Sequence, residues 1–518
     1  MSIVFDLLLD ALLTRMDHII YFVYSLLTGR YATESSKHVP GDKVSFQQFF
    51  YTETETLCKV VSTKGYKTAF FGKFHNGRPL LDDLRDADPN NANVTSALEE
   101  NYAMLQEYVV KHTGCSLAER IFEGNPGDLK IPEMLRRHNV PWVLEGAINT
   151  LKDAVKTNTK LYMEIHLTYP HGAFNIRKPK QSRATPRGYL KHGPDILGNL
   201  DVASVCGESP HNFCKAAAAL DEIVKLVYDE ISADGVRENT LFLVLSDHSY
   251  AAKGTVYDAG SRTLGLITWP AAIPRGTVFP KITANIDVST SHLAFFTLTH
   301  STTLFYNNIF TMQVFPTILD AVGVKIEKGT HSGISWLDSF AGKHSRDHIY
   351  LEAYDARAIV TTSWKYVIRG CNRISEGVCD PDDEGAFRTR KNYLKKIGPY
   401  ADYWETEQAY SLSGNNYSEY SMSLQMPCDE LDRLKSLLLH KYSNLNSLSS
   451  AKHANISCID TGSPDPVFII AILAAVLCAA ALLLAQRAIA AKRRGGCMLK
   501  KVHIGEVEEV SDSSTAVQ

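Results

Sequence analysis

The sequence has no marked excess of charge of either sign, which argues against partners that are bound mainly through charge. Acidic and basic residues nearly balance over its 518 residues, and the formal net charge at pH 7 is −3. Proteins that bind nucleic acid carry a basic surface for the phosphates, so we expect no nucleic-acid partner. The hydrophobic content of 45% is ordinary for a globular protein, and the length favours more than one domain.

The beginning of the chain lacks the features of a secretory signal peptide. Such a leader opens with basic residues and continues with an uninterrupted apolar stretch. Met1–Leu13 contains neither Lys nor Arg, and Asp6 and Asp10 interrupt its apolar residues. The next apolar stretch, Ile19–Leu27, is short. We therefore expect the true start of the protein to lie upstream of Met1.

Long apolar runs are also scarce, and only one is long enough to cross a membrane. Val467–Ala485 is uninterrupted and comes close to the length of about 20 residues that a spanning helix needs. Basic residues follow from Arg487 to Arg494, and such residues mark the cytosolic side. We expect a transmembrane helix over 467–486, a cytosolic tail over 487–518 and a lumenal or extracellular body before them.

On the lumenal side of this topology lie eight of the ten cysteines, an even number that permits disulfides. Cys371 and Cys379 are the most plausible local pair, although buried free thiols are common as well. Three Asn-x-Ser/Thr triplets, which begin at Asn93, Asn416 and Asn455, would be glycosylation acceptors there.

Predicted helices alternate with short apolar runs up to about residue 340. Helical periodicity covers Asn91–Leu105, Val140–Val155 and Ala216–Ser232, whereas Lys160–Leu167 and Asn239–Leu245 have the length and composition of buried strands. This alternation is typical of an α/β domain with a mostly parallel, mixed sheet that is flanked by helices. We assign this domain to residues 1–345.

From about His348 the pattern changes to short strands, such as Ala358–Thr361 and Lys365–Ile368. They predict a smaller antiparallel-sheet subdomain over 346–442. The segment 443–466 is rich in Ser and Asn and is expected to be a stalk in front of the membrane.

The most informative motif follows the strand predicted at Asn239–Leu245. Asp247 and His248 come directly after it, and Lys253 lies a few residues further on. In open α/β sheets, ligands bind at the carboxyl ends of the strands. A carboxylate beside an imidazole suits a divalent cation, and a lysine suits an anionic substrate. An isolated Asp-His pair of this kind would more commonly be an ordinary polar turn.

Two other predicted strands end in a similar way. His171 follows the strand Lys160–Leu167, and Lys73 and His75 lie on one side of an extended segment that starts at Gly65. With Asp247, His248 and Lys253 they supply the groups that bind a metal and a tetrahedral oxyanion and donate a proton to a leaving oxygen.

In this order, the motifs resemble those of the sulfatase family within the alkaline-phosphatase-like superfamily. Seven segments are similar to elements of that family: Ser25–Arg30, Gly65–His75, Tyr169–His171, Leu245–Pro270, Phe315–Gly323, Gly333–Ser335 and Arg357–Tyr366. The resemblance implies an alkaline-phosphatase-like fold, hydrolysis of sulfate esters, and a sulfated small molecule or glycan as substrate.

The resemblance also implies a metal site. Asp247 and His248 would be ligands of a divalent cation, usually calcium in this family, and Asp247 is the hard oxygen ligand that calcium prefers. Of the family's two upstream Asp ligands, only Asp10 is a candidate here.

The same resemblance implies roles around the sulfate group. Lys73, His171 and Lys253 would hold its oxygens, and His75 would assist at the nucleophile or the leaving group. These positive groups would offset charge that grows on the leaving oxygen.

The chain departs from the family at the nucleophile. The family converts the Cys that opens its Cys-x-Pro-Ser-Arg signature into formylglycine. Counting back from Ser25–Arg30 gives Ile19 at the Cys position and Val23 at the Arg position. Isoleucine has no nucleophile, so we find none in the chain and expect this polypeptide to be inactive as a sulfatase.

A second departure is the segment 288–313. It lies between Asp287 and Val314, which would be joined directly in a chain with the family's pattern. It contains no Lys, Arg, Asp or Glu. Codons for Val288-Ser289 and for Gln313 are compatible with an intron donor and acceptor. We expect a retained intron, and the alternative is a surface loop that is specific to this lineage.

Three functions remain open from the sequence. The leading one is a membrane-anchored sulfatase homologue. The second is a catalytically dead relative that binds sulfated glycans. The third is a hydrolase or transferase of the superfamily that acts on phosphate esters or phosphonates, which would need Ser or Thr as nucleophile, and Thr14 is the only nearby candidate.

Overall fold

The computed structural model of the protein describes residues 3–9, 19–31, 54–77, 79–171, 182–194, 196, 212–233, 235–247, 255–261, 265–273, 303–305, 314–325, 332–341, 347–353, 356–369, 405, 407–412, 419 and 426–442. All of them belong to one compact unit, Met1–Ile459. Among the described helices, none is long and apolar enough to cross a membrane. The predicted span Val467–Ala485 lies outside the described residues.

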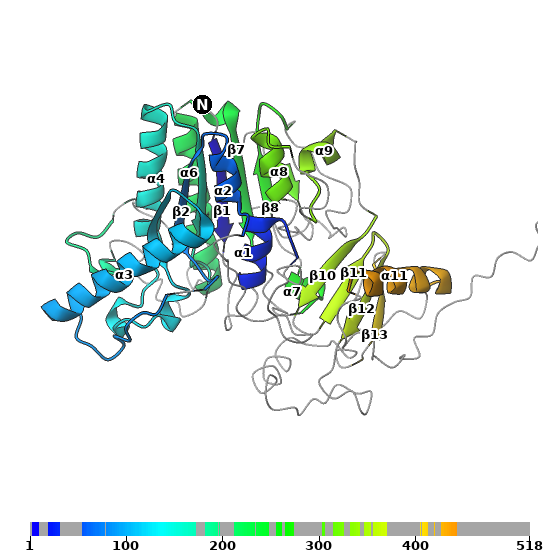
Figure 1. Ribbon diagram of the computed structural model, residues 1–518, viewed down its shortest axis with the longest axis horizontal. Coiled ribbons are helices and arrows are strands. Elements are labelled where there is room, and N and C mark those ends of the chain that lie inside the picture. The colour runs from blue at the N-terminus through cyan, green and yellow to red at the C-terminus, as the bar shows by residue number, and fades with distance from the viewer. Residues whose placement is uncertain are drawn as a thin grey trace, which may run out of the picture. The chain divides into compact units, whose positions relative to one another are not determined.

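The centre of this unit is a seven-stranded sheet in the order β3-β2-β4-β1-β7-β8-β9 (Figure 1). Across the sheet its strands are Leu117–Phe122 (β3), Lys67–Lys73 (β2), Leu161–His166 (β4), Ile3–Leu9 (β1), Thr240–Ser246 (β7), Gly265–Thr268 (β8) and Thr303–Phe305 (β9). The first five are parallel, and β8 and β9 are antiparallel to their neighbours. The predicted α/β class with a mostly parallel, mixed sheet is confirmed.

Strand β1 is the main element that the sequence did not predict. Its residues belong to the stretch that was compared with a signal peptide, yet they pair with β4 on one side and β7 on the other. At the far edge, β9 falls within the segment 288–313 that we expect to be a retained intron.

A two-stranded hairpin, Ala184–Thr185 (β5) and Gly188–Tyr189 (β6), forms a separate sheet.

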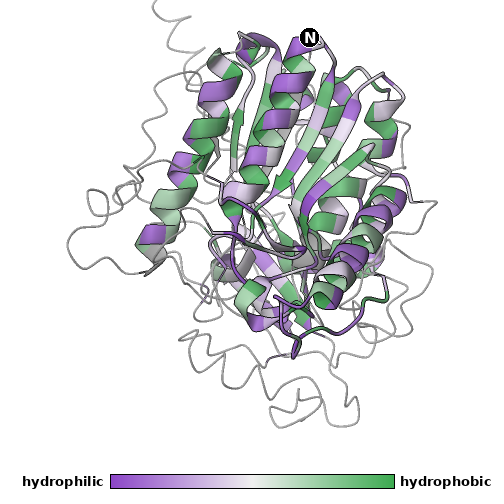
Figure 2. Cartoon of the chain, turned by 90° about the vertical axis from the view of Figure 1, so that its left-hand side faces the viewer, coloured by the Kyte–Doolittle hydropathy of each residue, from purple (hydrophilic) through white to green (hydrophobic). Residues whose placement is uncertain are grey.

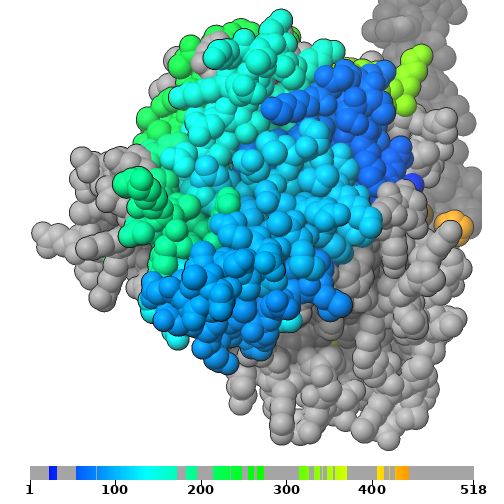
Figure 3. Space-filling model, turned by 60° about the vertical axis from the view of Figure 1, so that its left-hand side comes forward, coloured from blue at the N-terminus to red at the C-terminus, as the bar shows by residue number. Residues whose placement is uncertain are grey.

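Helices lie on both faces of the central sheet, whose strands are largely hydrophobic (Figure 2). The helices are Ile19–Thr28 (α1), Leu57–Ser62 (α2), Ala92–Thr113 (α3), Val140–Lys156 (α4), Asn212–Ala233 (α6), Val314–Ala321 (α8) and Trp336–Phe340 (α9), with short 3-10 turns at Pro126–Asp128, Glu133–Leu135 and Arg237–Asn239. α4 packs on β2, β3 and β4, and α1, α2 and α8 pack on one another. Residues 54–77 and 79–171, coloured blue to cyan, form a continuous face (Figure 3).

The three predicted helices are confirmed, but α3 is longer than its periodicity indicated. Asn91 caps its N-terminus by accepting a hydrogen bond from the Asn93 backbone N–H. The helix continues to Thr113 and ends where Gly114 takes a left-handed conformation with φ of 71°. A disulfide joins Cys58 on α2 to Cys115, just before β3. The predicted pair Cys371 and Cys379 lies outside the described residues.

The predicted antiparallel subdomain is a separate four-stranded sheet in the order β10-β11-β12-β13. The strands are Ile349–Ala353, Ala356–Val360, Trp364–Arg369 and Glu407–Ser411. Helix α11, Cys428–Lys441, packs on β11 and β12, and Leu434 joins Tyr366 and Ile368 in the core between them. The other face carries Val367 and packs against Tyr257.

A buried ionic cluster lies beside Tyr257. The Lys365 ammonium donates to Asp258 Oδ1 at 3.1 Å and to Glu419 Oε1 at 2.5 Å. Asp258 begins the short helix α7, Asp258–Ser261, and its backbone N–H donates to Glu419 Oε2. Burial raises the pKa of Glu419 to about 7, with the Lys365 ammonium opposing and the Asp258 carboxylate adding to the rise.

We predict that this cluster loses stabilising free energy as the pH rises. The folded chain keeps a proton on Glu419 up to a pH of about 7, whereas the ordinary pKa of this group is 4.5. Between these two pH values the folded state binds more protons than the unfolded state, so stability falls as the pH increases. Glu419→Gln keeps a neutral side chain and should remove this contribution.

The measurement is urea unfolding of wild type and Glu419→Gln at several pH values from 5 to 8. Wild type should lose free energy of unfolding relative to the variant as the pH rises. The comparison between the two proteins cancels the titration of histidines that both contain. A difference that is constant over this range, or that grows in favour of wild type, would contradict the assignment.

Candidate functional site

The carboxyl ends of four adjacent parallel strands lie along one edge of the central sheet. β2 ends at Lys73, β4 at His166, and β7 at Ser246, with Asp247 next. Neighbouring strands are about 4.8 Å apart, so β2 and β7 are separated by about 14 Å. This width accommodates a tetrahedral anion beside a cation, whereas it is too large for all the predicted groups to meet at one atom.

Lys73 is held at this edge by an irregularity in β2. Its side chain is only 3% exposed. The register of β2 against β3 shifts between Phe71 and Gly72, and such bulges redirect the side chains that follow them. Gly72 has a φ of 89°, and a Cβ there would lie 1.9 Å from the carbonyl oxygen of His166. The Lys73 ammonium places a positive charge at the carboxyl end of β2, and this is the sign that suits an anion.

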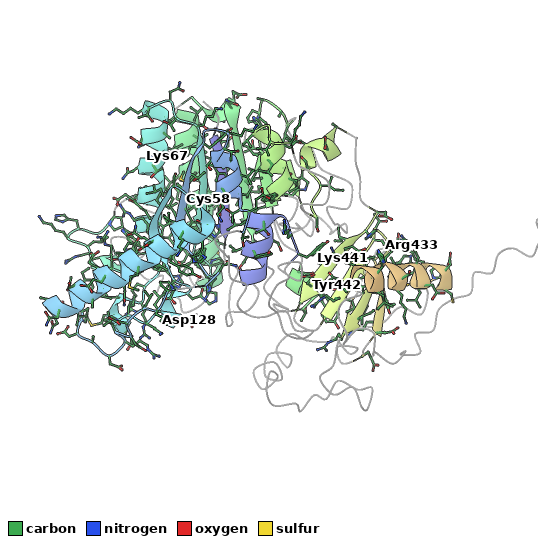
Figure 4. The ribbon with its side chains drawn as sticks, in the orientation of Figure 1. Cys58, Lys67, Asp128, Arg433, Lys441 and Tyr442 are labelled. Atoms are coloured by element: carbon green, nitrogen blue, oxygen red, sulfur yellow. A yellow bond between two sulfur atoms is a disulfide. The ribbon has the colours of Figure 1, made fainter. Side chains whose placement is uncertain are left out.

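His75 follows two residues later and lies against a loop that the sequence did not single out. Its ring faces Gly124, where an added Cβ would lie 3.1 Å from His75 Cε1. The loop continues into buried Asn125, whose amide donates to Asp128 Oδ2 at 3.2 Å; Figure 4 labels Asp128. Because β3 is adjacent to β2, this loop forms a wall of the site beside His75.

His171 reaches the same edge from β4. The chain continues beyond the strand through buried Tyr169, and the His171 backbone N–H donates to the Thr168 carbonyl oxygen at 3.1 Å. The ring of Tyr169 lies 5.3 Å from that of His138. Burial raises the pKa of Tyr169 to about 12, so its phenol stays neutral at physiological pH. His171 itself is half-buried.

Asp247 is the one predicted metal ligand among the described residues, and it is 6% exposed. Leu9, the last residue of β1, pairs with Ser246, the last residue of β7. Asp10, His248 and Lys253 lie outside the described residues. The Asp247 carboxylate is a hard oxygen donor of the kind that divalent cations such as calcium prefer. The described part of the chain contains no group of three or more His, Cys, Asp or Glu side chains that could hold a metal ion.

A row of buried polar side chains on β4 was missed by the sequence reasoning. The Tyr162 hydroxyl donates to Glu164 Oε1 at 2.6 Å, and Glu164 Oε2 lies 3.1 Å from His166 Nε2. All three side chains are at most 1% exposed. Strands in a parallel sheet that is covered on both faces are normally apolar throughout. In the sequence, Tyr, Glu and His alternate with apolar residues along this strand, and this alternation could have predicted a polar row on one face of β4.

The role of Gly72 generates a prediction with a matched control at Gly65. Both glycines have positive φ, 89° and 79°, so alanine at either position introduces backbone strain of about 1–2 kcal/mol. Only at Gly72 does the new Cβ also collide with the His166 carbonyl, and overpacking adds about 1–3 kcal/mol. Chemical denaturation should give a loss of about 2–5 kcal/mol for Gly72→Ala. Equal losses for the two variants would contradict the close approach of β2 and β4.

Comparison with known proteins identifies the family. The model of the family described as Sulfatase matches residues 22–324, more than half of the 518 residues. A protein from Formosa agariphila named Sulfatase is 24% identical over 311 residues, which are 49% of this chain and 54% of that protein. The chain therefore spans about half the length of this curated relative.

Solved structures are similar at a low level. A sulfatase from a Pseudoalteromonas species has a TM-score of 0.41 and 15% identity, covering 70% of this chain and 77% of its own. A phosphonate monoester hydrolase from Silicibacter pomeroyi has a TM-score of 0.43 and 14% identity. The match covers 86% of this chain and 89% of the hydrolase chain. A protein solved with its substrate D-glucosamine-2-N,6-O-disulfate has a TM-score of 0.45 and 13% identity. The match covers 87% of this chain and 99% of that protein's chain. The assignment rests on the family model, and by that match the chain belongs to the sulfatase family.

Proposed function

We propose that this chain binds sulfate esters at the carboxyl edge of its central sheet, as a membrane-anchored member of the sulfatase family. One observation carries the proposal. Lys73, His171 and Asp247, which are far apart in the sequence, follow strands of one parallel sheet and share one of its edges. Lys73 and Asp247 are both buried there, so this edge carries one positive and one negative side chain that solvent barely reaches.

In this proposal the positive groups hold the sulfate. Lys73, His171 and Lys253 donate hydrogen bonds to its oxygens, and His75 stands near the leaving oxygen. Charge-assisted hydrogen bonds of this kind are stronger than neutral ones, and they gain strength where water is excluded. The ester is expected to belong to a sulfated small molecule or a glycan.

A divalent cation, calcium by family resemblance, would be held by Asp247, His248 and Asp10. When bound, it would neutralise part of the negative charge of the sulfate group. The carboxylate of Asp247 is the hard oxygen donor that such a cation requires, and its burial supports this assignment.

We propose further that this polypeptide binds its ligand without turning it over. Ile19 is the first residue of α1, and its position in the sequence is that of the family's formylglycine. An alkyl side chain cannot form the covalent intermediate, and the remaining groups of a catalytic unit do not compensate for such a loss. The catalytically dead homologue is therefore the form of the family function that we favour for this chain.

The test compares two lysines at opposite ends of β2. Lys73→Ala should weaken binding of 4-nitrophenyl sulfate about 10- to 150-fold, since a charge-assisted hydrogen bond contributes about 1.5–3 kcal/mol. Lys67→Ala is the control, because Lys67 is partly exposed and pairs with Asp153 at 3.4 Å; Figure 4 labels Lys67. Calorimetric titration of the full chain gives both dissociation constants, and Lys253→Ala should behave like Lys73→Ala.

Two outcomes would contradict this account. Equal effects of Lys67→Ala and Lys73→Ala would remove the anion site from the edge of the sheet. Hydrolysis of 4-nitrophenyl sulfate well above background, abolished by Asp247→Ala, would show that Ile19 does not occupy the nucleophile position.

The proposed topology has an independent test at Asn93. This residue is exposed on the first turn of α3 and opens an Asn-Val-Thr triplet. If the body of the chain is lumenal, the protein made in a eukaryotic host should carry a glycan here. Glycosidase treatment should shift wild type and Asn90→Gln in a gel, and Asn93→Gln should lack one glycan. A chain without glycans, whose C-terminal tail is protected in sealed vesicles, would overturn the topology.

A further inference from the structure

Asn125, in the loop after β3, has a buried side-chain oxygen without a hydrogen-bond donor in the part of the chain that the structure describes. The side chain is 3% exposed, and its amide nitrogen donates to Asp128 Oδ2 at 3.2 Å. Because a carboxylate only accepts, this bond fixes which end of the amide is the oxygen. The Asp128 backbone N–H donates to the Asn125 carbonyl oxygen at 2.9 Å, so the turn is held by its main chain as well.

Thr168, two residues after the end of β4, has a hydroxyl in the same condition. The residue is 2% exposed, and its carbonyl accepts from the His171 backbone N–H at 3.1 Å, but Oγ1 has no partner among the described residues. Other buried threonine hydroxyls are satisfied: those of Thr28, Thr113 and Thr185 each donate to a backbone carbonyl at 2.6–2.8 Å. Buried polar groups are normally bonded in this way, so the Thr168 hydroxyl is an exception that points to an outside partner.

These two groups lie on either side of the strand that carries Lys73. The sheet order β3-β2-β4 places β2 between the strands that lead to Asn125 and to Thr168. Neighbouring strands are about 4.8 Å apart, so about 10 Å separates the two outer strands at the edge of the sheet. One cationic side chain is thus flanked by two neutral polar groups at the proposed anion site.

The loop that carries Asn125 also reaches the surface. Gly127 and Asp128 are exposed, and a Cβ added at Gly127 would meet no described atom within 4 Å. A neutral amide oxygen accepts from a hydroxyl, and a threonine hydroxyl can both donate and accept. A site with buried polar groups of this kind discriminates strongly against analogues that lack the matching hydroxyl, because those groups then stay unpaired.

We propose that Asn125 and Thr168 form a subsite for the hydroxyl groups of a sugar, beside the anion at Lys73. The inference rests on the proposed sulfate-ester site, and it makes the ligand a sulfated saccharide and not an aryl sulfate. Asn125 Oδ1 accepts a hydrogen bond from one sugar hydroxyl, and Thr168 Oγ1 bonds a second. Both residues contact the neutral part of the ligand, so they contribute little to binding of the sulfate group itself.

Calorimetric titration of the full chain compares 4-nitrophenyl sulfate, which has no hydroxyl group, with glucose 6-sulfate, galactose 6-sulfate and N-acetylglucosamine 6-sulfate. Wild type should bind at least one sugar sulfate about tenfold more tightly than the aryl sulfate. Thr168→Val should weaken binding of that sugar about three- to tenfold, as expected for one neutral hydrogen bond, and change binding of 4-nitrophenyl sulfate less than twofold.

Asn125→Leu should have the same selective effect on the sugar sulfate. This variant also removes the bond to Asp128, so Asp128→Ala, which removes that bond alone, is its control. Asp128→Ala should weaken binding of the sugar sulfate less than Asn125→Leu does. Equal effects of the two variants would remove Asn125 from the subsite.

Urea unfolding tests the subsite without any ligand. Valine has the shape of threonine, so Thr168→Val removes an unpaired hydroxyl and should leave the midpoint unchanged or raise it. Thr185→Val is the matched control, because its hydroxyl donates to the Gly188 carbonyl oxygen at 2.8 Å. It should lower the midpoint and leave binding of both kinds of ligand unchanged. Equal decreases for the two variants would show that the protein itself satisfies Thr168, and would overturn the subsite.

The binding results separate failure of the subsite from failure of the proposed function. A chain that binds 4-nitrophenyl sulfate keeps the sulfate site. In that chain, the subsite is overturned if no sugar sulfate binds more tightly, or if Thr168→Val weakens both kinds of ligand by the same factor. A wild type that binds neither kind of ligand would refute the proposed function, and the subsite with it.

Discussion

The parallel pairing of β2, β4, β1 and β7 is the constraint on which the rest of the molecule depends. Parallel strands have their carboxyl ends at one edge, so residues from three distant parts of the chain gather there. Lys73, His171 and Asp247 owe their common location to this pairing. The bulge between Phe71 and Gly72 then sets the orientation of the first of them.

Buried polar groups recur at each level of the structure. Tyr162, Glu164 and His166 form a row along β4, Lys73 is the last residue of β2, and Lys365 on β12 contacts Asp258 and Glu419. Each of these groups costs free energy to bury unless its partner is in place. Well-packed apolar side chains would stabilise the fold at least as well, so the buried polar groups on β4 and at the end of β2 point to a site at that edge of the central sheet.

Much of this fold could be predicted from local pattern. The apolar run before Asp247 and the periodicity over Ala216–Ser232 gave β7 and α6, because burial on one or both faces imposes those patterns. β1 was missed because Asp6 interrupts its apolar run, and only its pairing with β4 and β7 defines it. The partners of Lys365 could not be read from the sequence either, since they are 54 and 107 residues away and meet through tertiary packing.

The central claim is that an anion binds at the carboxyl edge of the central sheet. A crystal structure of the full chain grown with selenate tests it most directly, because selenate is tetrahedral like sulfate and its selenium gives an anomalous signal. The account predicts one strong peak within about 3 Å of Lys73 Nζ and of the His171 ring. A structure in which selenate binds elsewhere, or is absent from this edge, would contradict it.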